Sequence, residues 1–382
     1  MEYKLEELFD LQMGKTPSRS NPEYWNTGDN KWISIADLSK CGKYICETKE
    51  CISDMAVKES GISQIPANTV VMSFKLSIGK TAITSEDMYS NEAIMSFRDK
   101  HVVDLLPEYV YYLLQAHNWN EGTNKAVMGK TLNKATLSKI KVSIHSRKEQ
   151  IEIINCLNTV MRIVNTRQQQ LQKLDELVKA RFVEMFGDPI SNPKGWKKDK
   201  AGNHIDLLSG YPFQSEQYVN DGINICGGLI IMPQKIQWQD CKHWPSVDGY
   251  EDYLLAEDDI VMALDRPWIS EGFKIAQVDS THLPALLIQR TARIRGIDVN
   301  QQYLFHCFVN GGFDKHSNVT GSLVPHISAK DIRSFEILLP PIKLQKQFAA
   351  FVKQVDKSKV AVQKALDEAQ LLFDSLMQKY FG

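Results

Sequence analysis

Apolar side chains recur every seven residues in two long stretches of the chain, one from about residue 150 to 186 and one from about residue 345 to the C-terminus. This spacing places them on one face of an α-helix and is typical of helices that pack lengthwise against another helix. We therefore predict two long helices. The side chains expected at their interface are Leu157, Val160, Val164, Leu171, Leu174 and Val178 in the first and Val352, Val355, Val362, Leu366, Phe373 and Leu376 in the second.

Each predicted helix needs a partner for its apolar face, and the nearest partner is the other helix of the same chain. We expect the two helices to form an antiparallel coiled coil. A helix of about 37 residues is roughly 55 Å long at 1.5 Å per residue, so the pair would be a rigid spacer. The pattern leaves one alternative open, in which each apolar face packs only against its own globular domain.

The remaining sequence predicts short strands mixed with turns. Strand-like runs rich in Val, Ile and aromatic residues, bounded by Gly, Pro, Asn or Asp, occupy residues 32–35, 69–74, 93–97, 260–263 and 285–294. Pro107 is expected to open a helix that continues through Leu114. Strands and helices do not alternate regularly, which favours an α+β fold over a doubly wound sheet.

The two halves of the chain repeat one another. The clearest matches are Gln150 with Gln345, Gly187 with Gly382, and Gly14 with Gly210. The offset drifts along the chain, as it does when loops change length around a retained scaffold. We therefore predict a pseudo-two-fold internal repeat with domains at 1–146 and 189–341, a long central helix at 147–188 and a long C-terminal helix at 342–382.

Composition sets limits on the class of protein. The chain has 382 residues, of which 43% are hydrophobic, and this is enough for two domains with full cores. The sequence has neither an apolar run that could cross a bilayer nor a signal segment, so we expect a cytoplasmic protein without membrane contact, whose seven cysteines are reduced. The net charge of −1 lacks the basic excess typical of nucleic-acid-binding proteins. Any contact with DNA would therefore use local patches or charge from a partner.

Several motifs that resemble catalytic signatures are incomplete. Gly-Lys-Thr occurs at 14–16, 79–81 and 129–131, but none of the three has the first glycine of a phosphate-binding loop. Asn21-Pro22-Glu23-Tyr24 is close to the motif of amino-methyltransferases, yet no glycine-rich turn for S-adenosylmethionine precedes it. Glu47-Thr48-Lys49 has a nuclease-like spacing without a metal-binding aspartate on a strand ahead of it. We therefore expect no catalytic residues and no metal site in this chain.

Polar and basic loops occur at corresponding places in both halves. Arginine and lysine can read guanine, asparagine and glutamine can read adenine, and lysine, serine and threonine can hold phosphates. Each residue alone is more often a solvated loop residue, but the recurrence makes the set a candidate for DNA binding. The first-half candidates are Lys15, Thr16, Ser18, Arg19, Lys75, Ser77, Lys80, Lys125, Lys130 and Thr131, and the second-half candidates are Gln214, Ser215, Arg266, Ser270, Lys274, Lys315, His316 and Asn318.

Four motifs carry a resemblance to a known family. Pro340-Pro341-Ile342-Lys343-Leu344-Gln345 heads the last helix, the run from Phe182 to Pro189 closes the first, and the segments Gly14 to Ser18 and Asn21 to Trp25 lie near the N-terminus. Together they resemble the specificity subunits of type I restriction-modification systems over essentially the whole chain. The first copy departs from the pattern, with His145-Ser146 in place of the two prolines.

The resemblance implies two similar target recognition domains separated by two long antiparallel coiled-coil helices, each domain reading one half of a split, asymmetric double-stranded DNA target. It implies that the helices set the unspecified gap and dock two modification subunits, which bind S-adenosylmethionine and flip and methylate an adenine. A restriction and translocase subunit would add chemistry that needs ATP and Mg²⁺. The chain itself is then a non-catalytic, sequence-specific subunit without cofactors. The alternatives are a stand-alone DNA methyltransferase or nuclease, and a coiled-coil scaffold without sequence-specific DNA binding.

Overall fold

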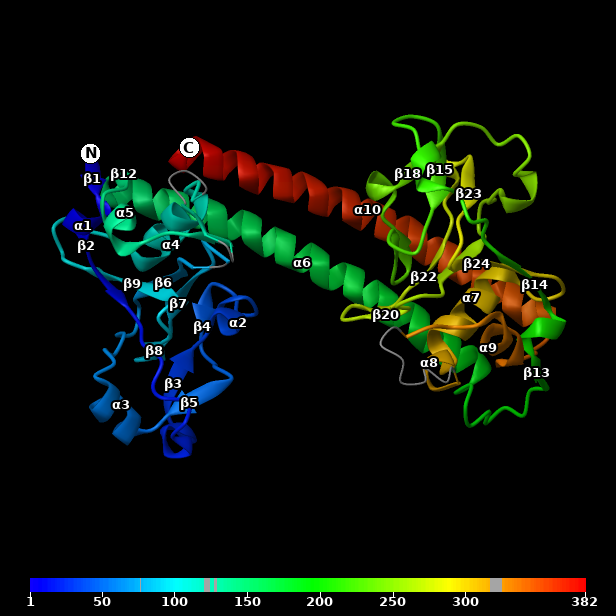
Figure 1. The fold of residues 1–382 in the computed structure, drawn as a ribbon, viewed down its shortest axis with the longest axis horizontal. Coiled ribbons are helices and arrows are strands. Elements are labelled where there is room, and N and C mark those ends of the chain that lie inside the picture. The colour runs from blue at the N-terminus through cyan, green and yellow to red at the C-terminus, as the bar shows by residue number, and fades with distance from the viewer. Residues whose placement is uncertain (76, 120–123, 127–128, 317–324) are drawn as a thin grey trace. The chain divides into compact units, whose positions relative to one another are not determined.

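The computed structural model describes residues 1–75, 77–119, 124–126, 129–316 and 325–382 (Figure 1). The chain forms two compact units. Unit 1 contains Met1–Gln168 and Lys364–Gly382, and unit 2 contains Gln169–Gln363. Within the described residues, no helix is both long enough and apolar enough to cross a membrane. All seven cysteines are free thiols, as predicted.

Unit 1 is built on a five-stranded sheet. Its strand order is β2 (Phe9–Met13), β9 (Ile94–Asp99), β6 (Val70–Ser73), β7 (Thr81–Thr84) and β4 (Tyr44–Ile45). A three-stranded sheet has the order β5 (Glu50–Ile52), β3 (Trp25–Ile33) and β8 (Tyr89–Ser90). Helix α4 (Pro107–Ala116) packs on β6 and β7, and β1 (Glu2–Lys4) pairs with β12 (Lys141–Ser143).

Unit 2 repeats this topology. Its larger sheet has the order β14 (Ile205–Ser209), β24 (Thr291–Gly296), β19 (Ile260–Ala263) and β22 (Ile275–Gln277). Its smaller sheet has the order β18 (Lys242–Trp244), β15 (Ile223–Cys226) and β23 (Ala285–Leu287), with α7 (Gln301–Asn310) in the place of α4 and the pair β13 (Lys198–Lys200) and β25 (Glu336–Leu338) in the place of β1 and β12. In both smaller sheets one pairing is parallel, β3 with β8 and β15 with β23. The predicted α+β repeat is confirmed.

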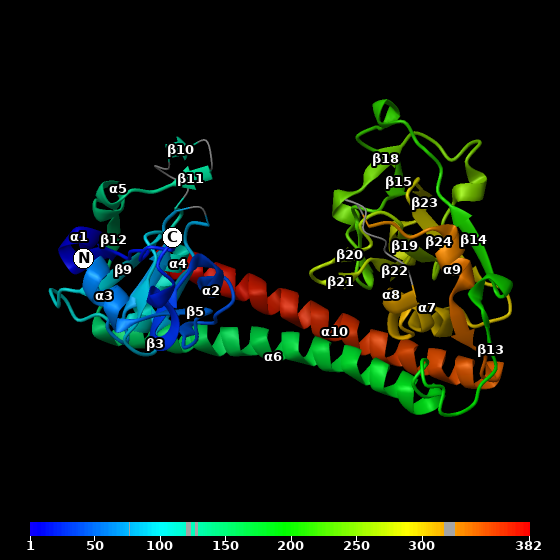
Figure 2. The ribbon, with the colours of Figure 1, turned by 60° about the horizontal axis from the view of Figure 1, so that its bottom comes forward.

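Short elements connect these strands. In unit 1 they are α1 (Leu5–Leu8), α2 (Ile35–Leu38), α3 (Asp54–Ser60), β10 (Asn124–Ala126), β11 (Gly129–Thr131) and α5 (Lys134–Ser138). In unit 2 they are β16 (Ile231–Met232), β17 (Lys235–Ile236), β20 (Trp268–Ile269), β21 (Gly272–Phe273), α8 (Phe313–His316) and α9 (Ala329–Ser334). Figure 2 shows β10 and β11 in unit 1 and α7 against α10 in unit 2.

Two 40-residue helices, α6 (Arg147–Phe186) and α10 (Ile342–Phe381), contribute to the cores of both units. The first half of α6 shares the core of unit 1 with the end of α10, through Leu157 and Phe373. The second half of α6 shares the core of unit 2 with the start of α10, through Phe182 and Phe348. The helices are therefore antiparallel, as predicted (Figure 1), and the alternative in which each packs only on its own domain is wrong. All twelve predicted interface side chains are buried or half-buried.

The repeated glutamine has a structural role in each unit. Gln150 is fully buried, accepts from the Leu106 amide at 3.0 Å and donates to the carbonyls of Asp104 and His145 at 2.9 and 3.0 Å. Gln345 is also buried, and it accepts from a backbone amide at 2.9 Å and donates to a carbonyl at 2.8 Å at the equivalent place. A buried unpaired backbone group costs about 1–3 kcal/mol, so each glutamine stabilises the join between a long helix and its unit.

The repeated glycine marks a close approach of two backbones. A Cβ atom on Gly14 would lie 2.1 Å from the carbonyl oxygen of Ser90, and one on Gly210 would lie 2.0 Å from the carbonyl oxygen of Ile288. Both distances are far below van der Waals contact, so a side chain at either position would force the backbones apart. The glycine therefore allows the chain that follows β2 or β14 to pack closely against the end of β8 or the residue after β23.

Two predicted strands have different boundaries in the structure. The strand predicted at 32–35 ends at Ile33, because Ser34 caps helix α2 by accepting from the Asp37 amide. The strand predicted at 285–294 is two strands, β23 and β24, which belong to different sheets. The turn between them contains Arg290 with a φ of 64°, a left-handed conformation that ends a strand.

A histidine in the core of unit 2 makes that unit sensitive to acid. His306 is 6% exposed and lies against the rings of Phe182 and Phe348. Burial, with the nearby Lys359 ammonium, lowers its pKa to about 3. Because an unfolded histidine has a pKa of about 6.5, the unfolded chain takes up the proton first as the pH falls. Stability that is fully present above about pH 6.5 is therefore lost progressively towards pH 3.

We expect His306→Leu to reduce this acid sensitivity. Each pH unit within the window costs about 1.4 kcal/mol through this group. Between pH 6.5 and pH 5.0, the free energy of unfolding should fall by about 1.6 kcal/mol more in the natural chain than in His306→Leu. Denaturant titrations at the two pH values measure the difference, and an equal fall in both proteins would contradict the assignment.

Candidate nucleic-acid interface

The predicted loops of unit 1 gather at one end of its larger sheet. Strands β2 and β6 end there, at Met13 and Ser73, and β9 begins between them, since Met13 pairs with Met95 and Ser73 with Ile94. The loop at 14–20 and the described residues 74–75 and 77–80 therefore lie at the same sheet end, which we call the loop edge. The third loop, which carries β10 and β11, also returns to this edge, because the Leu132 amide donates to the Phe74 carbonyl at 3.1 Å.

Unit 2 has an equivalent loop edge. Strand β14 ends at Ser209 and β19 at Ala263, and both pair with the beginning of β24, at Ala292 and Thr291. A third segment returns to this edge too. The Ile327 amide donates at 2.8 Å to the carbonyl of Leu264, which directly follows β19. In each unit the topology therefore brings together three loops that are far apart in sequence.

An arginine of unit 1 is held in place at the loop edge. The Arg19 guanidinium lies 3.6 Å from the ring centroid of Trp25 and donates to both carboxylate oxygens of Glu50, at 2.6 and 3.0 Å. The hydrogen bond from Arg19 lowers the pKa of Glu50 and opposes the effect of burial. The Arg19 side chain is still 52% exposed. A stacked and hydrogen-bonded guanidinium of this kind is preorganised to meet a base edge or a phosphate.

The other unit 1 candidates are partly occupied by internal partners. The Lys15 ammonium donates to the Ser60 carbonyl, the Thr16 hydroxyl to Glu92 and the Lys80 ammonium to the Ser39 hydroxyl. Ser18 is exposed and shares a hydrogen bond of 2.7 Å with the Ser20 hydroxyl.

On the second loop, the Lys75 ammonium lies 5.3 Å from the ring centroid of Phe74 and Ser77 is exposed. The third-loop candidates lie in β10 and β11, but the side chains of Lys125, Lys130 and Thr131 lie outside the described residues, and so does the whole of Asn318. The DNA contacts of all these residues stay predictions.

Most unit 2 candidates are exposed at or near the loop edge, and these are Gln214, Ser215, Arg266, Ser270 and Lys315. Two further candidates have internal partners.

Lys274 is 6% exposed, its ammonium donates to the Gly228 carbonyl, and burial lowers its pKa. His316 is half-buried, with its Nε2 atom 3.1 Å from the Ser334 hydroxyl. Either residue would have to leave its internal partner to contact DNA, and the DNA contacts of both stay predictions.

Sequence reasoning missed other residues at these edges. Trp25 and Glu50 hold Arg19, and only the tryptophan lies inside a motif that the sequence made visible. In unit 2, Arg290 is exposed in the turn before β24, 3.4 Å from the Asp265 carboxylate. No sequence signal set Arg290 apart, because it falls within a run that predicts one continuous strand.

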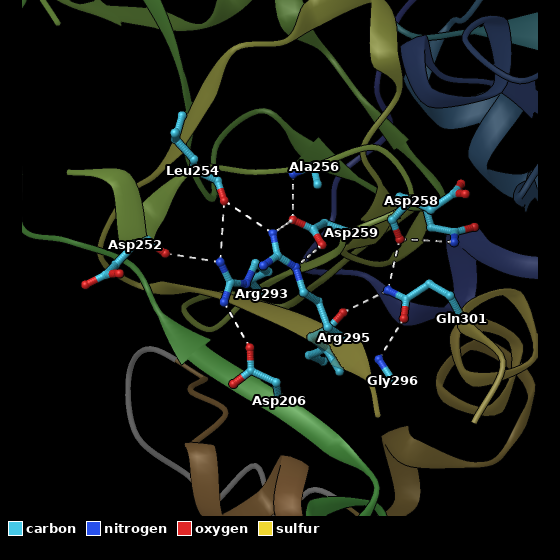
Figure 3. A network of polar contacts seen from close by, with 12 residues as sticks. Asp206, Asp252, Leu254, Ala256, Asp258, Asp259, Arg293, Arg295, Gly296 and Gln301 are labelled. Atoms are coloured by element: carbon cyan, nitrogen blue, oxygen red, sulfur yellow. Dashed lines mark hydrogen bonds and ion pairs between the residues drawn. The ribbon is translucent and has the colours of Figure 1, made fainter. Parts of the chain in front are cut away.

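Two arginines of unit 2 serve the fold rather than the loop edge (Figure 3). Arg293 is 7% exposed and donates to the Asp206 carboxylate at 2.9 Å and to the Asp252 carbonyl at 3.1 Å. Arg295 forms a bidentate pair with the buried Asp259, at 2.5 and 2.7 Å. Figure 3 shows both side chains pointing from β24 towards the 252–259 segment, which they hold to the sheet.

Among the described residues, no group of three or more histidine, cysteine, aspartate or glutamate side chains could hold a metal ion. The expectation that this chain binds no metal itself stays a prediction. The arrangement at each loop edge is one of hydrogen-bond donors, acceptors and cations at the ends of strands. Such an arrangement can bind an anionic polymer and read its bases.

Comparisons with known proteins agree with this arrangement. The family model for the type I restriction modification DNA specificity domain matches residues 1–176 and 246–369. The type I restriction enzyme MjaIX specificity subunit of Methanocaldococcus jannaschii is 23% identical to this chain, over 98% of this chain and 91% of its own length.

Two solved structures share the fold. The S subunit of a type-I restriction-modification system from M. genitalium has a TM-score of 0.57 and 12% identity, and the match covers 100% of this chain and 96% of that chain. A chain from a structural study of complex assembly and conformational transition of the type I R-M system also has a TM-score of 0.57, with 15% identity, and the match covers 100% and 97% of the two chains.

Proposed function

We propose, from the premise that this chain belongs to the type I restriction-modification DNA specificity family, that each of its two units reads one half of a split, asymmetric double-stranded DNA sequence. The chain is the DNA specificity subunit of such a system. It follows from the family that the chain is the non-catalytic recognition component, in place of a stand-alone methyltransferase or nuclease.

One observation carries this proposal, the duplicated loop edge with different side chains on it. Both edges are formed by the same strand ends, yet unit 1 presents Arg19 and Lys75 where unit 2 presents Gln214 and Arg266. Different donors and acceptors on one scaffold read different bases. A scaffold without sequence-specific binding would have no need for two such edges.

We further propose that partner subunits supply the chemistry. Two modification subunits would bind S-adenosylmethionine and methylate adenines, and restriction and translocase subunits would use ATP and Mg²⁺, all in the cytoplasm. Exposed apolar side chains on the two long helices support docking there, among them Ile163, Leu177, Val360 and Leu371. Since the net charge is only −1, the partners would also supply part of the phosphate contact.

We expect a matched deletion in both helices to change the gap between the two half-sites. Removing residues 165–171 and 362–368 takes one heptad from facing stretches, which is about 10 Å of helix. Because one base pair rises about 3.4 Å, the unspecified gap should shorten by about three base pairs, or assembly should fail. Methylome sequencing of a host that carries the chain with its modification subunit measures the motif.

The control for this experiment deletes residues 165–171 alone. That chain has helices of unequal length and cannot fill both cores, so we expect it to be unfolded by circular dichroism. The natural chain should give a motif with two specified parts. If the matched deletion left the same motif methylated at the same level, the long helices would not set the gap.

A further inference from the structure

The larger sheets of the two units differ at one edge. In unit 1, β4 pairs in parallel with β7, and the amides of Ile83 and Ser85 donate to the carbonyls of Lys43 and Ile45 at 2.8 and 3.1 Å. In unit 2, β22 is the last strand of its sheet among the described residues. A bare strand edge presents backbone groups that can pair with another chain.

Strand registers identify the uncovered positions. Val70 pairs with Ile83 in unit 1, and the equivalent Ile260 pairs with Gln277 in unit 2. The turn between β16 and β17 reaches only the start of β22, where the Gln234 amide donates to the Ile275 carbonyl at 2.8 Å. Gln277 and the residues after it therefore lack the strand that covers their counterparts in unit 1.

A cleft of about 930 Å³ lies beside this edge, entirely within unit 2. Residues 277–280 form one side of it, and α7 and the facing stretches of α6 and α10 form the others. Its volume is at the upper end of the range for ligand pockets. The long helices, to which we assign partner docking, thus form part of the cleft wall.

Unit 1 fills the equivalent place with its own lysine. Lys43 directly precedes β4. Its ammonium lies 2.7 Å from the Glu108 carboxylate and 4.7 Å from the ring centroid of Tyr112, and it also donates to the Asn158 amide oxygen. Burial opposes ionisation of Glu108, but the hydrogen bonds from Lys43 and Asn158 still lower its pKa. In unit 1, therefore, the strand that pairs with the sheet edge also places a cation among hydrogen-bond acceptors.

Unit 2 keeps a buried, unpaired polar atom at this place. The α7 positions equivalent to Glu108 and Tyr112 are Gln302 and His306, and both line the cleft. The Oε1 atom of Gln302 is buried without a hydrogen-bond partner. His306 is 6% exposed, and its Nδ1 atom lies 3.3 Å from the side-chain nitrogen of Asn310.

Charge on the cleft wall favours a cation. Carboxylates from three elements line it, including Asp175, Glu257 and Asp356, and carboxylates outnumber lysines. The Lys359 ammonium is already paired, 2.6 Å from Asp175 and 3.6 Å from Asp356. Burial raises the pKa of Asp356, and the neighbouring carboxylates add to this effect although Lys359 opposes it. An incoming cation would relieve the repulsion, whereas DNA would increase it.

We propose that this cleft binds an extended segment of a modification subunit that carries a lysine or arginine. The segment adds to β22 as β4 adds to β7, and its cationic side chain reaches Gln302 and the acidic wall. Pairing of a peptide with a free sheet edge is a common mode of recognition, with side-chain pockets giving specificity. This inference rests on the proposed function, because the partner is the modification subunit that the chain recruits.

Reversing one charge in the cleft tests the proposal. We expect Asp356→Lys to weaken binding of the purified modification subunit about tenfold or more, as measured by calorimetry with the full-length chain. The matched control is Asp221→Lys, which makes the same charge change at an exposed loop position of unit 2, outside the cleft and the long helices. It should bind within about twofold of the natural chain. Thermal melting shows whether both variants are folded.

A cross-linking measurement identifies the occupant without relying on that variant. Val360 lines the cleft and is 71% exposed, so a photoreactive p-benzoylphenylalanine there should cross-link to a segment of the modification subunit that contains lysine or arginine. Mass spectrometry maps the segment. Cross-links only to a second copy of this chain, or none to the modification subunit, would overturn the proposal.

Binding of the modification subunit and methylation of the DNA site are measured separately. If Asp356→Lys binds the modification subunit as tightly as the natural chain, the cleft proposal is wrong, while methylation of a split site would still support the function. If the natural chain binds no modification subunit at all, both proposals fail.

Discussion

We expect Phe182→Ala to lower the free energy of unfolding of unit 2 by about 3–5 kcal/mol, the usual cost of removing a fully buried phenylalanine. Phe182 has no exposed surface and lies at the centre of a ring cluster, 5.7 Å from Tyr303, 5.5 Å from Phe348 and 5.2 Å from Phe186, measured between ring centroids. These rings come from α6, α7 and α10. Their contact joins both long helices to the globular part of the unit.

Guanidinium titration followed by tryptophan fluorescence measures this loss, since Trp238, Trp244 and Trp268 lie in unit 2. The control is Val183→Ala, at the next position of α6, where the side chain is 43% exposed. We expect that change to cost less than about 0.5 kcal/mol. A loss below about 1 kcal/mol in Phe182→Ala would mean that the ring cluster does not hold the helices to unit 2.

The sequence predicts the long helices well because their signal is local and repetitive. A seven-residue period over many turns fixes both the element type and the buried face. It also explains why Leu157 and Val178 are correctly assigned although they belong to different cores. The period cannot reveal that Gln150 is fully buried, since a polar residue at a helix start ordinarily faces water. Only the recurrence of Gln150 as Gln345 marks that position.

The limits of the prediction are clearest at turns. Ser34 ends a predicted strand by capping a helix, and Arg290 divides another by adopting a left-handed backbone conformation. Each change depends on a single residue inside an apolar run. The hydrophobic pattern of such a run does not indicate where the backbone changes direction. The assignment of β23 and β24 to different sheets depends on contacts distant in sequence.

The sequence predicts which loops form the candidate site, but it does not predict the environment of each side chain in them. Repetition places the loops at equivalent points, and the strand registers show why they meet at one sheet end. Repetition cannot show that Lys274 is buried against the Gly228 carbonyl, because burial of a lysine depends on the surrounding fold. It also hides differences between the copies, such as Lys43 and its strand, which lack a counterpart beside β22 in the described structure.

We expect exchange of the first recognition domain to change one half of the DNA target and leave the other unchanged. The exchange replaces residues 1–146 with the equivalent domain of a family member that reads a different half-site. This boundary keeps β1 and β12 together, since Glu2 pairs with Ser143. All loop-edge residues of unit 1 lie within the exchanged range and those of unit 2 lie outside it, so base contacts should change in one half-site only.

The matched control exchanges residues 189–341 and should change the other half-site. In both chains the unspecified gap should stay the same, because α6 and α10 keep their lengths. A mismatched base pair costs about 1–3 kcal/mol in a specific site, so loss of a whole half-site abolishes methylation at the original target.

Methylome sequencing of a host that carries the 1–146 exchange with its modification subunit shows whether each unit reads its own half-site. We expect a methylated motif in which one specified half is new, while the other half and the gap are those of the natural chain. A motif in which both halves change, or in which neither does, would show that the two units do not read DNA separately.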